Sequence, residues 1–429
     1  MQLLKLEVLP SRPMRIIVVA LVLWFAATMY GLSQKSAAVT LSPKVPADLP
    51  SKPTQADAVT FAWQSFVALN WPALANQRGV PDPNRKIGDA GTVVWHTWKI
   101  PEEVFLPDGS VPAAWNTYAS ALPPECRAVA GDTLAPGDLV LFRTSKVSAD
   151  TNGNNALELA NEVVGGTLTD QRGNLARYDI RLNKTEFDAI VQNRYYNVQG
   201  QNAARVIQLP AGIMEVKASW RILPANDPLQ SRFVQRPAWI YTPANGPQPA
   251  VCTSATVGLT GLHITQKTPT RPQWIWATFE QIDNVPPFGG KRPPGRTLPY
   301  SFNNPGCPIL SCPPNQSTED GRLPTTPTQV TRVIDIGAEA SAANQVWRGA
   351  LKGTRFEYYE LVDVQWPKTP VRRPFGDPTP GLLANTTMET YIEDSSCLHC
   401  HFTARTQSGK LSSDFTFMLA KARPAQERP

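Results

Sequence analysis

Two cysteines and a histidine, Cys397, Cys400 and His401, lie within five residues near the C-terminus in the spacing C-x-x-C-H. The chain contains only 6 cysteines and 4 histidines in 429 residues. Random placement would produce this spacing with a probability below roughly one in a thousand. Two thiols three positions apart can each add to a vinyl group of haem, and the next histidine can ligate the iron. The motif therefore predicts one covalent haem c, bonded to Cys397 and Cys400, with His401 as the proximal ligand.

Three other kinds of site use a C-x-x-C pair. A redox dithiol usually opens a helix of a βαβ unit, and no such pattern surrounds these residues. Zinc needs four ligands at tetrahedral angles, and no second C-x-x-C or H-x-x-x-H lies nearby to complete the set. A disulfide across so short a loop would be strained. These readings stay open, and the haem reading is preferred.

The residue on the other side of the iron decides between two functions. A haem with both axial positions filled carries electrons, whereas an open position binds or activates a small ligand. Met388, nine residues before Cys397, is the preferred ligand, and Met418 and His263 are alternatives, as is none of the three. Each of these three residues could instead have a purely structural role, because methionines often fill cores and lone histidines between apolar residues are often structural.

Two functions from different classes follow from this choice. The first is a mono-haem electron-transfer protein whose partner is a redox protein or a respiratory component. The second is a haem enzyme, such as a peroxidase or oxygenase, with His263 or Glu280 as its acid or base. We find no paired carboxylates at a telling spacing, no G-x-S-x-G, no P-loop and no G-x-G-x-x-G, which weighs weakly against hydrolases and nucleotide-binding proteins.

Covalent haem attachment takes place outside the cytoplasm, so an export signal is expected. Residues 16–34 carry no charge, Arg12 and Arg15 precede them, and Lys35 follows. This pattern predicts a secretory signal within residues 1–38, but the uncharged run is also close to the length of a membrane span. The sequence therefore predicts a periplasmic protein that is either soluble after cleavage or anchored to the membrane by this segment.

The net charge and the other four cysteines are consistent with a folded exported protein. The net charge of +6 is spread along the chain without a basic stripe, so no nucleic-acid partner is predicted. The other four cysteines predict up to two disulfides in an oxidising compartment. Cys307 with Cys312 and Cys126 with Cys252 is one of three possible pairings.

The hydrophobic pattern predicts an α+β protein: a β-rich body with a few helices and many loops, followed by a short helical haem-binding segment. The 42 prolines support many short elements. The expected boundaries are a linker over residues 39–53, the body over 54–380 and the haem segment over 381–429. Alternating residues predict strands over 212–223, 272–282 and 355–366. Helices are expected from Thr54 to Pro72, from a cap at Thr185, and over 340–353. Residues 285–328 are expected to form a long irregular loop.

In the haem segment, short helices are expected over residues 385–396 and 412–422. Only 28 residues follow His401. This is shorter than a separate small cytochrome domain needs, so the body is expected to provide part of the haem surface.

Several segments resemble a family of bacterial exported cytochrome c proteins. They are "FAWQSFVALNWP", "VWHTWKIPEEVF", "GIMEVKASWRIL", "GLHITQKT…WIWATFEQIDNVP" and "ANTTMETYIEDSSCLHCH…DFTF". The resemblance covers most of the mature chain and implies one covalent haem c, bound at Cys397, Cys400 and His401, and a redox role without a named substrate. Met388 and His263 fall inside the matching segments. Met418 stands where leucine is expected, and His96 stands where an acidic residue is expected.

Overall fold

The computed structural model describes residues 39–118, 122–131, 135–141, 167–242, 244, 247–287, 295–316 and 327–426. The N-terminal segment predicted to be an export signal or anchor lies outside these residues. Among the residues just given, no helix has both the length and the apolar character that a bilayer span requires. The described residues from Leu41 onward form one compact unit, so the predicted body and haem segment pack together.

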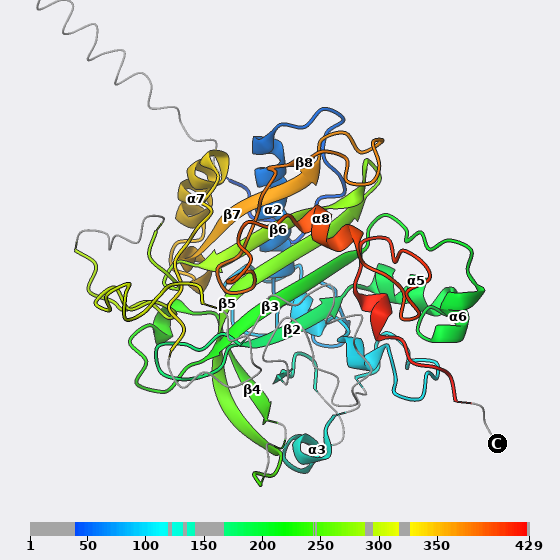
Figure 1. Cartoon of the computed structure of the whole chain (residues 1–429), viewed down its shortest axis with the longest axis horizontal. Helices are drawn as coiled ribbons and strands as arrows, with labels where there is room; N and C mark the ends of the chain where they lie inside the picture. The colour runs from blue at the N-terminus through cyan, green and yellow to red at the C-terminus, as the bar shows by residue number, and fades with distance from the viewer. Residues whose placement is uncertain are drawn as a thin grey trace, which may run out of the picture. The chain divides into compact units, whose positions relative to one another are not determined.

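A mixed sheet forms the centre of this unit (Figure 1). The described residues contain eight strands: β1 (Val140–Leu141), β2 (Arg177–Leu182), β3 (Met214–Ile222), β4 (Gln235–Thr242), β5 (Val251–Thr268), β6 (Arg271–Gln281), β7 (Tyr359–Pro367) and β8 (Pro378–Thr379). The order is β1-β4-β5-β6-β7-β8, with β3 pairing the second half of β5 and β2 pairing β3. All pairs are antiparallel except β1 with β4. The α+β class is therefore confirmed.

Helices and 3-10 turns surround the sheet. The described helices are α2 (Gln55–Leu69), α3 (Pro124–Ala130), α5 (Lys184–Gln192), α6 (Val198–Ala203), α7 (Ala338–Ala350) and α8 (Cys397–Phe402). The 3-10 turns are η1 (Val94–Thr97), η2 (Pro101–Glu103), η3 (Gln230–Arg232), η4 (Arg355–Tyr358) and η5 (Met418–Lys421).

One face of the sheet is apolar and aromatic. Phe279 of β6 lies under Trp63 and Phe66 of α2, with ring centroids 5.0 and 4.4 Å apart. Trp63 also stacks on Trp347 of α7 at 5.7 Å, so both helices cover this face. Aromatic side chains bury large areas, and such pairs each add about 0.5–1.5 kcal/mol beyond that burial. This packing fixes the sheet on which the second face is built.

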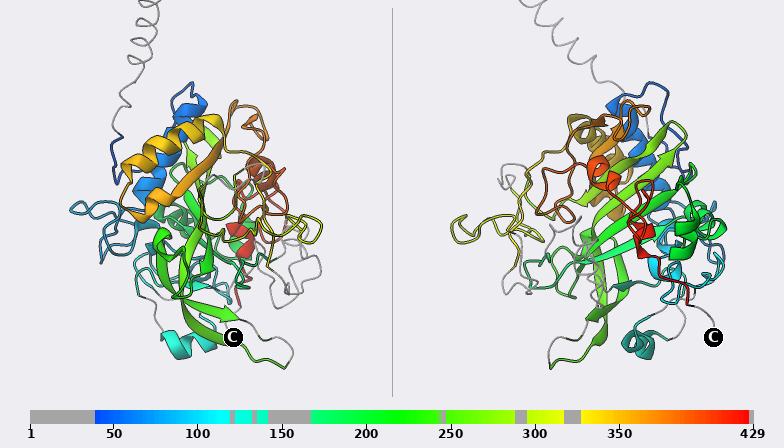
Figure 2. Two further views of the ribbon diagram at one scale, coloured as in Figure 1. Left: turned by 90° about the vertical axis from the view of Figure 1, so that its left-hand side faces the viewer. Right: turned by 45° about the vertical axis from the view of Figure 1, so that its right-hand side comes forward.

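The second face is more polar, and the C-terminal segment covers it (Figure 2). Thr278, the neighbour of Phe279, points to the opposite face because side chains alternate along a strand. Its hydroxyl accepts a hydrogen bond from Asn385 Nδ2 at 2.8 Å. Ser219 of β3 similarly shares a 2.7 Å hydrogen bond with Thr387. The C-terminal segment is therefore bound to the sheet by side-chain hydrogen bonds rather than by apolar packing alone.

Several predicted elements are confirmed. The expected strands over 212–223 and 272–282 appear as β3 and β6, and the helix expected from Thr54 appears as α2, where Thr54 forms a capping box with Asp57. Both proposed disulfides are present, Cys126–Cys252 and Cys307–Cys312. Part of the predicted 39–53 linker packs on the body, because Gln266 Nε2 donates to the carbonyl oxygen of Pro46 at 2.9 Å.

Four local predictions were wrong. Asn183, not Thr185, caps α5, since its side chain accepts from the amide of Glu186. The strand expected over 355–366 begins only at Tyr359, after the turn η4. Residues 385–396 form turns instead of a helix, because Glu280 and sheet residues compete for the backbone and side-chain groups of this stretch. Of the helix expected over 412–422, only η5 is present.

Candidate functional site

The C-x-x-C-H motif begins a short helix, α8, that is fixed to β7. Ser396 caps this helix by accepting from the amide of His399. Gln365 Oε1, on β7, accepts from Ser396 Oγ at 3.0 Å and from the amide of Leu398 at 2.9 Å. Leu398 is fully buried. The start of the helix is therefore positioned by the sheet without help from the two thiols.

Cys397 and Cys400 lie on one side of α8 because residues three apart are neighbours on a helix surface. Both are half-buried, and neither takes part in the two disulfides of the described residues. Thiols held on one helical face, at the edge of a packed surface, are suited to bond to the two vinyl groups of one haem.

His401 is oriented by a backbone carbonyl. Its Nδ1 lies 2.8 Å from the oxygen of Phe415, which can only accept, so Nδ1 carries the proton. The lone pair is then on Nε2. Metal-bound histidines commonly donate their other ring N–H to a carbonyl or carboxylate in this way. Burial lowers the pKa of His401 to about 3, which keeps the imidazole in the neutral form that a metal requires.

The carbonyl that holds His401 comes from an unusual backbone. Asp414 and Phe415 have φ angles of +57° and +74°, in the left-handed region that residues other than glycine rarely adopt. Such conformations cost of the order of 1–3 kcal/mol each and persist only where neighbours enforce them. Asp414 is fixed by Lys267 Nζ at 2.5 Å and by the amide of Leu209 at 2.7 Å. The backbone is therefore strained at Asp414 and Phe415, where the carbonyl oxygen of Phe415 accepts the hydrogen bond from His401.

Aromatic rings surround α8. Trp276 of β6 and Phe417 flank His401, with ring centroids 4.2 and 5.0 Å away. On the outer side, Phe375 packs on His399 and Phe402 at 4.1 and 4.9 Å. Rings of this kind offer the flat apolar contact that a porphyrin needs, and they reduce access of water to the imidazole.

A polar cluster lies on the sheet in the electrostatic neighbourhood of His401. His263 of β5 pairs across the strands with Lys217 of β3, and its Nε2 lies 3.2 Å from the Glu389 carboxylate. Charge on Lys217 and His263 lowers the pKa of His401, and charge on Glu389 raises it. His263 therefore lies near enough for its charge to act on His401, and its ligation of iron stays a prediction.

The two methionines lie in packed environments. Met388 belongs to a buried cluster that contains no residue of the motif: Leu168, Ala176, Tyr178, Val285, Phe302 and Val330. Met418 is 2% exposed at the start of η5. Ligation of iron by Met388 stays a prediction, and its packing in this cluster weighs against it.

Two further residues considered from sequence have other surroundings. His96 lies against Trp95 and Trp220 with ring centroids 3.9 and 5.7 Å away, and burial lowers its pKa well below the usual value. Trp220 follows Ser219 on β3 and so faces away from the C-terminal segment. Glu280 is fully buried and accepts from Arg332 and Thr386, which makes it a structural anchor.

Sequence reasoning missed the groups that position the site: Gln365, Phe415, Lys217 and Glu389. The sequence carries little indication of their roles. Phe415 contributes a carbonyl, which carries no side-chain signature, and Lys217 appeared only as a polar residue in an alternating strand. The positions of Gln365 and Glu389 depend on pairing between distant segments.

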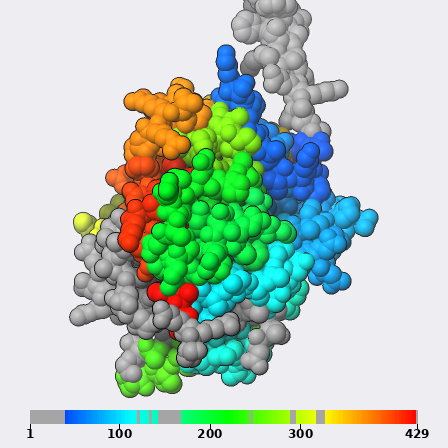
Figure 3. All heavy atoms as spheres, turned by 90° about the vertical axis from the view of Figure 1, so that its right-hand side faces the viewer, coloured from blue at the N-terminus to red at the C-terminus, as the bar shows by residue number. Residues whose placement is uncertain are grey.

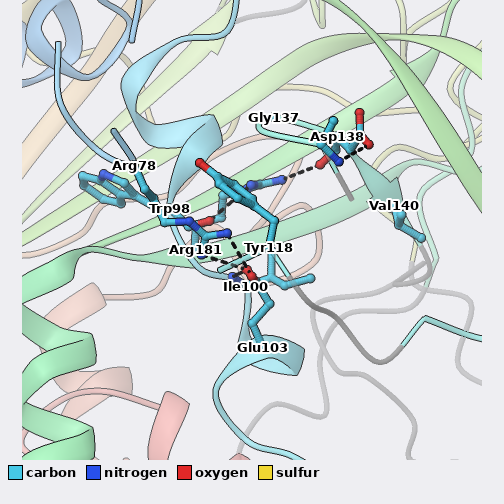
Figure 4. A pocket seen from close by; sticks show the side chains of 10 residues that line it. Arg78, Trp98, Ile100, Glu103, Tyr118, Gly137, Asp138, Val140 and Arg181 are labelled. Atoms are coloured by element: carbon cyan, nitrogen blue, oxygen red, sulfur yellow. Dashed lines mark hydrogen bonds and ion pairs between the residues drawn. The ribbon is translucent and has the colours of Figure 1, made fainter. Parts of the chain in front are cut away.

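A small pocket lies in another part of the fold (Figure 4). Its volume of about 20 Å³ suits a single water molecule. Arg78, Glu103 and Arg181 are among the residues that line it, and the Arg78–Glu103 ion pair at 2.9 Å is nearly inaccessible to solvent. No residue of the C-x-x-C-H motif lines this pocket, so it is not part of the candidate site.

Glu393, four residues before Cys397, is a buried titrating group beside the site. Its carboxylate accepts from the amide of Val333 at 2.7 Å and from Asn315 Nδ2 at 3.2 Å. Burial nevertheless raises the pKa of Glu393 to about 7. The folded protein therefore binds this proton more tightly than the unfolded chain does.

We expect the protein to lose stability as the pH rises because of Glu393. The contribution is complete below the unfolded pKa of about 4.5 and is lost as the pH rises through about 7. The slope for one group cannot exceed about 1.4 kcal/mol per pH unit. Urea unfolding at pH 5 and pH 8 should show that Glu393→Gln loses less free energy of unfolding between the two pH values than the wild type does. Glu339→Gln, at an exposed position of α7, should follow the wild type. An identical pH dependence for Glu393→Gln would contradict the assignment.

Comparison of the whole chain with protein-family models, with curated proteins and with solved structures finds no match. The described residues also contain no group of three or more His, Cys, Asp and Glu side chains arranged to hold a metal ion.

Proposed function

We propose that this protein is an exported redox protein that carries one covalent haem c, attached to Cys397 and Cys400, with His401 as the proximal ligand. The observation that carries the proposal is the geometry of His401. Its Nδ1–H is held by the Phe415 carbonyl at 2.8 Å, which leaves Nε2 for iron, directly after two thiols on one face of α8. A dithiol or disulfide function would not require an oriented neutral imidazole at this position.

The residues around the motif fit a haem by their chemistry. A bound haem would supply reversible one-electron chemistry at its iron. The thiols of Cys397 and Cys400 would hold it, Phe415 fixes the tautomer of His401, and Trp276 and the phenylalanines provide apolar contact. Since the sheet already orders α8 through Gln365, the chain is prepared for the group before it binds.

We propose electron transfer as the role of this haem. The protein would exchange single electrons with a redox partner protein or respiratory component in the periplasm, as the resemblance to exported cytochrome c proteins suggests. Residues 1–38 would serve as the export signal or the membrane anchor. The large body supports this role as a scaffold, because its sheet carries the haem segment directly.

Pigment retention tests the proposal. The full chain, made in a bacterial host with haem-maturation machinery, is expected to be coloured and to keep its pigment in acidified acetone, because thioethers survive that extraction. Its mass should exceed that of the processed polypeptide by one haem. A colourless protein, or pigment that is fully extracted, would contradict the proposal.

The second axial position can be tested separately. We expect His263→Ala to change the absorption spectrum of the haem protein and to increase carbon monoxide binding, because His263 lies in the electrostatic neighbourhood of His401. Met388→Leu should leave the spectrum unchanged, since Met388 packs in an apolar cluster. The reverse result would restore Met388 as the distal ligand.

One observation favours a second candidate function, a haem enzyme. Glu389 engages Nε2 of His263 at 3.2 Å, so the imidazole is oriented by a carboxylate, as in many proton-transferring histidines. In that case the wild-type protein itself would bind carbon monoxide, and Glu389→Gln would alter the pH dependence of ligand binding. A low-spin wild type that ignores the gas would instead support the electron carrier.

A further inference from the structure

Two glutamates meet between α5 and β3, beside the loop that orients His401. Figure 3 shows the C-terminal residues next to the α5–α6 segment on the surface. Glu186 of α5 is fully buried, and its carboxyl interacts with that of the half-buried Glu215 of β3. Both carboxylate oxygens of Glu186, and Oε1 of Glu215, receive no hydrogen bond from a donor among the described residues.

The two side chains approach closely enough to share a hydrogen bond. Carboxylates only accept, so that bond needs a proton. Two adjacent anions, one fully buried and one half-buried, would also repel each other, because the interior around Glu186 does not solvate its charge. Burial raises the pKa of Glu186 well above its usual value and also raises that of Glu215. The pair therefore holds at least one proton at pH values where surface glutamates have lost theirs.

A short chain of bonds links the pair to His401. The hydroxyl of Thr416 donates to Glu215, and this hydrogen bond lowers the pKa of that carboxyl. The amide nitrogen of Thr416 belongs to the same peptide group as the carbonyl of Phe415, which accepts from His401 Nδ1 at 2.8 Å. Thr416 is itself buried, and its Oγ1 accepts from the amide of Met418 at 2.9 Å. A change in the charge of the pair therefore acts on the imidazole of His401 through ordered hydrogen-bonded groups rather than through bulk water.

We propose that the Glu186–Glu215 pair is a proton-binding site that couples one proton to each electron taken up by the protein. This inference rests on the proposed function. One electron arrives from a reduced redox partner protein, and one proton from solvent binds to the carboxylate of the pair that is still ionised, so the net charge of the region does not change. Oxidation by the next partner releases the same proton. No other bond is made or broken.

The other charged groups around the pair are compensated or permanently charged. Lys421 on η5 lies near enough to lower the pKa of Glu215. Lys267 and Asp414 form an ion pair at 2.5 Å, and burial raises the pKa of Asp414. Lys217 follows Glu215 on the same face of β3, and Lys184 pairs with Asp188 in solvent on α5. Asp414, and Glu393 beside the C-x-x-C-H motif, also have raised pKa values and compete for a redox-linked proton, so the test compares the slope with and without the two carboxyls of the pair.

Potentiometry on the haem-loaded full chain between pH 5 and pH 9 provides this test. The midpoint potential should fall as the pH rises, because the reduced form binds the proton more tightly. The limit is a tenfold change in the redox equilibrium per pH unit, or 59 mV. Glu186→Gln alone mimics the proton that the pair already holds and leaves Glu215 able to titrate. We therefore expect the Glu186→Gln/Glu215→Gln double variant, which has no ionisable carboxyl in the pair, to lose the pH dependence, whereas Glu339→Gln should keep it.

Three results would overturn the inference: a wild-type potential that does not change with pH, an unchanged slope in the Glu186→Gln/Glu215→Gln double variant, or no protonated-carboxyl band in the infrared spectrum of the wild type at neutral pH. We expect that band to be present and to lose part of its intensity in the Glu186→Gln/Glu215→Gln double variant, with Glu393 supplying the remainder because its pKa is also raised to about 7; an unchanged band would overturn the inference as well. The infrared measurement does not need haem. A colourless protein therefore refutes the proposed function, whereas a coloured protein without the slope refutes only this inference.

Discussion

Replacing both Cys397 and Cys400 with serine is expected to abolish covalent haem attachment while leaving the fold intact. Serine cannot form the thioether, so no pigment should remain after acidified acetone. The fold should persist because Ser396, Leu398 and Gln365 position α8 independently of the thiols. Each single variant should keep one thioether and hence some covalent pigment. Absorption of the extracted protein and its intact mass measure the result.

The Cys307–Cys312 disulfide offers a matched control for this double replacement. Cys307 and Cys312 are also a pair close in sequence, but they close a loop whose Ile309 and Leu310 are 74% and 99% exposed. Changing both to serine removes two sulfurs without touching the site, and the haem content should equal that of the wild type. If both double variants lost the pigment equally, the loss would reflect impaired maturation of the chain, and the assignment of Cys397 and Cys400 would fail.

The elements that sequence patterns predicted well are those whose pattern is decided locally. The capping box of Thr54 and Asp57 is complete within four residues, and α2 begins there as expected. β3 alternates because one face packs on Trp95 and the other lies under the C-terminal segment. The pairing of Cys126 with Cys252 also followed once the nearby pair Cys307–Cys312 was assumed.

The haem segment was harder to predict because distant residues determine its conformation. A helix was expected over residues 385–396, yet the amide and the hydroxyl of Thr386 both donate to Glu280, 106 positions away. Asn385 similarly donates to Thr278 and to the carbonyl of Phe279. These bonds replace the local hydrogen bonds that a helix would make. The motif itself needed no such information, because its chemistry is contained in five residues.

The polar face of the sheet explains why the site and the fold are built together. A sheet face that is covered but polar requires specific partners, since each buried polar group without a hydrogen bond costs about 1–3 kcal/mol. The C-terminal segment provides these partners through Asn385, Thr386 and Thr387. Its attachment therefore depends on a few buried groups. Glu280 accepts two of these hydrogen bonds, from the amide and the hydroxyl of Thr386, and a further one from Arg332.

Replacing Glu280 with glutamine is expected to lower the free energy of unfolding by about 3–5 kcal/mol, because it removes the negative charge that pairs with the buried guanidinium of Arg332 at 2.8 Å. The spectrum of the folded haem protein should not change, since Glu280 is a structural anchor rather than an acid or base at the iron. Glu360→Gln is the matched control. Glu360 lies 3.8 Å from the same arginine, but its side chain is 20% exposed, so the loss should stay within about 1 kcal/mol. Urea unfolding measures both variants, and a Glu280→Gln protein of wild-type stability with an altered spectrum would instead restore Glu280 as a group acting at the iron.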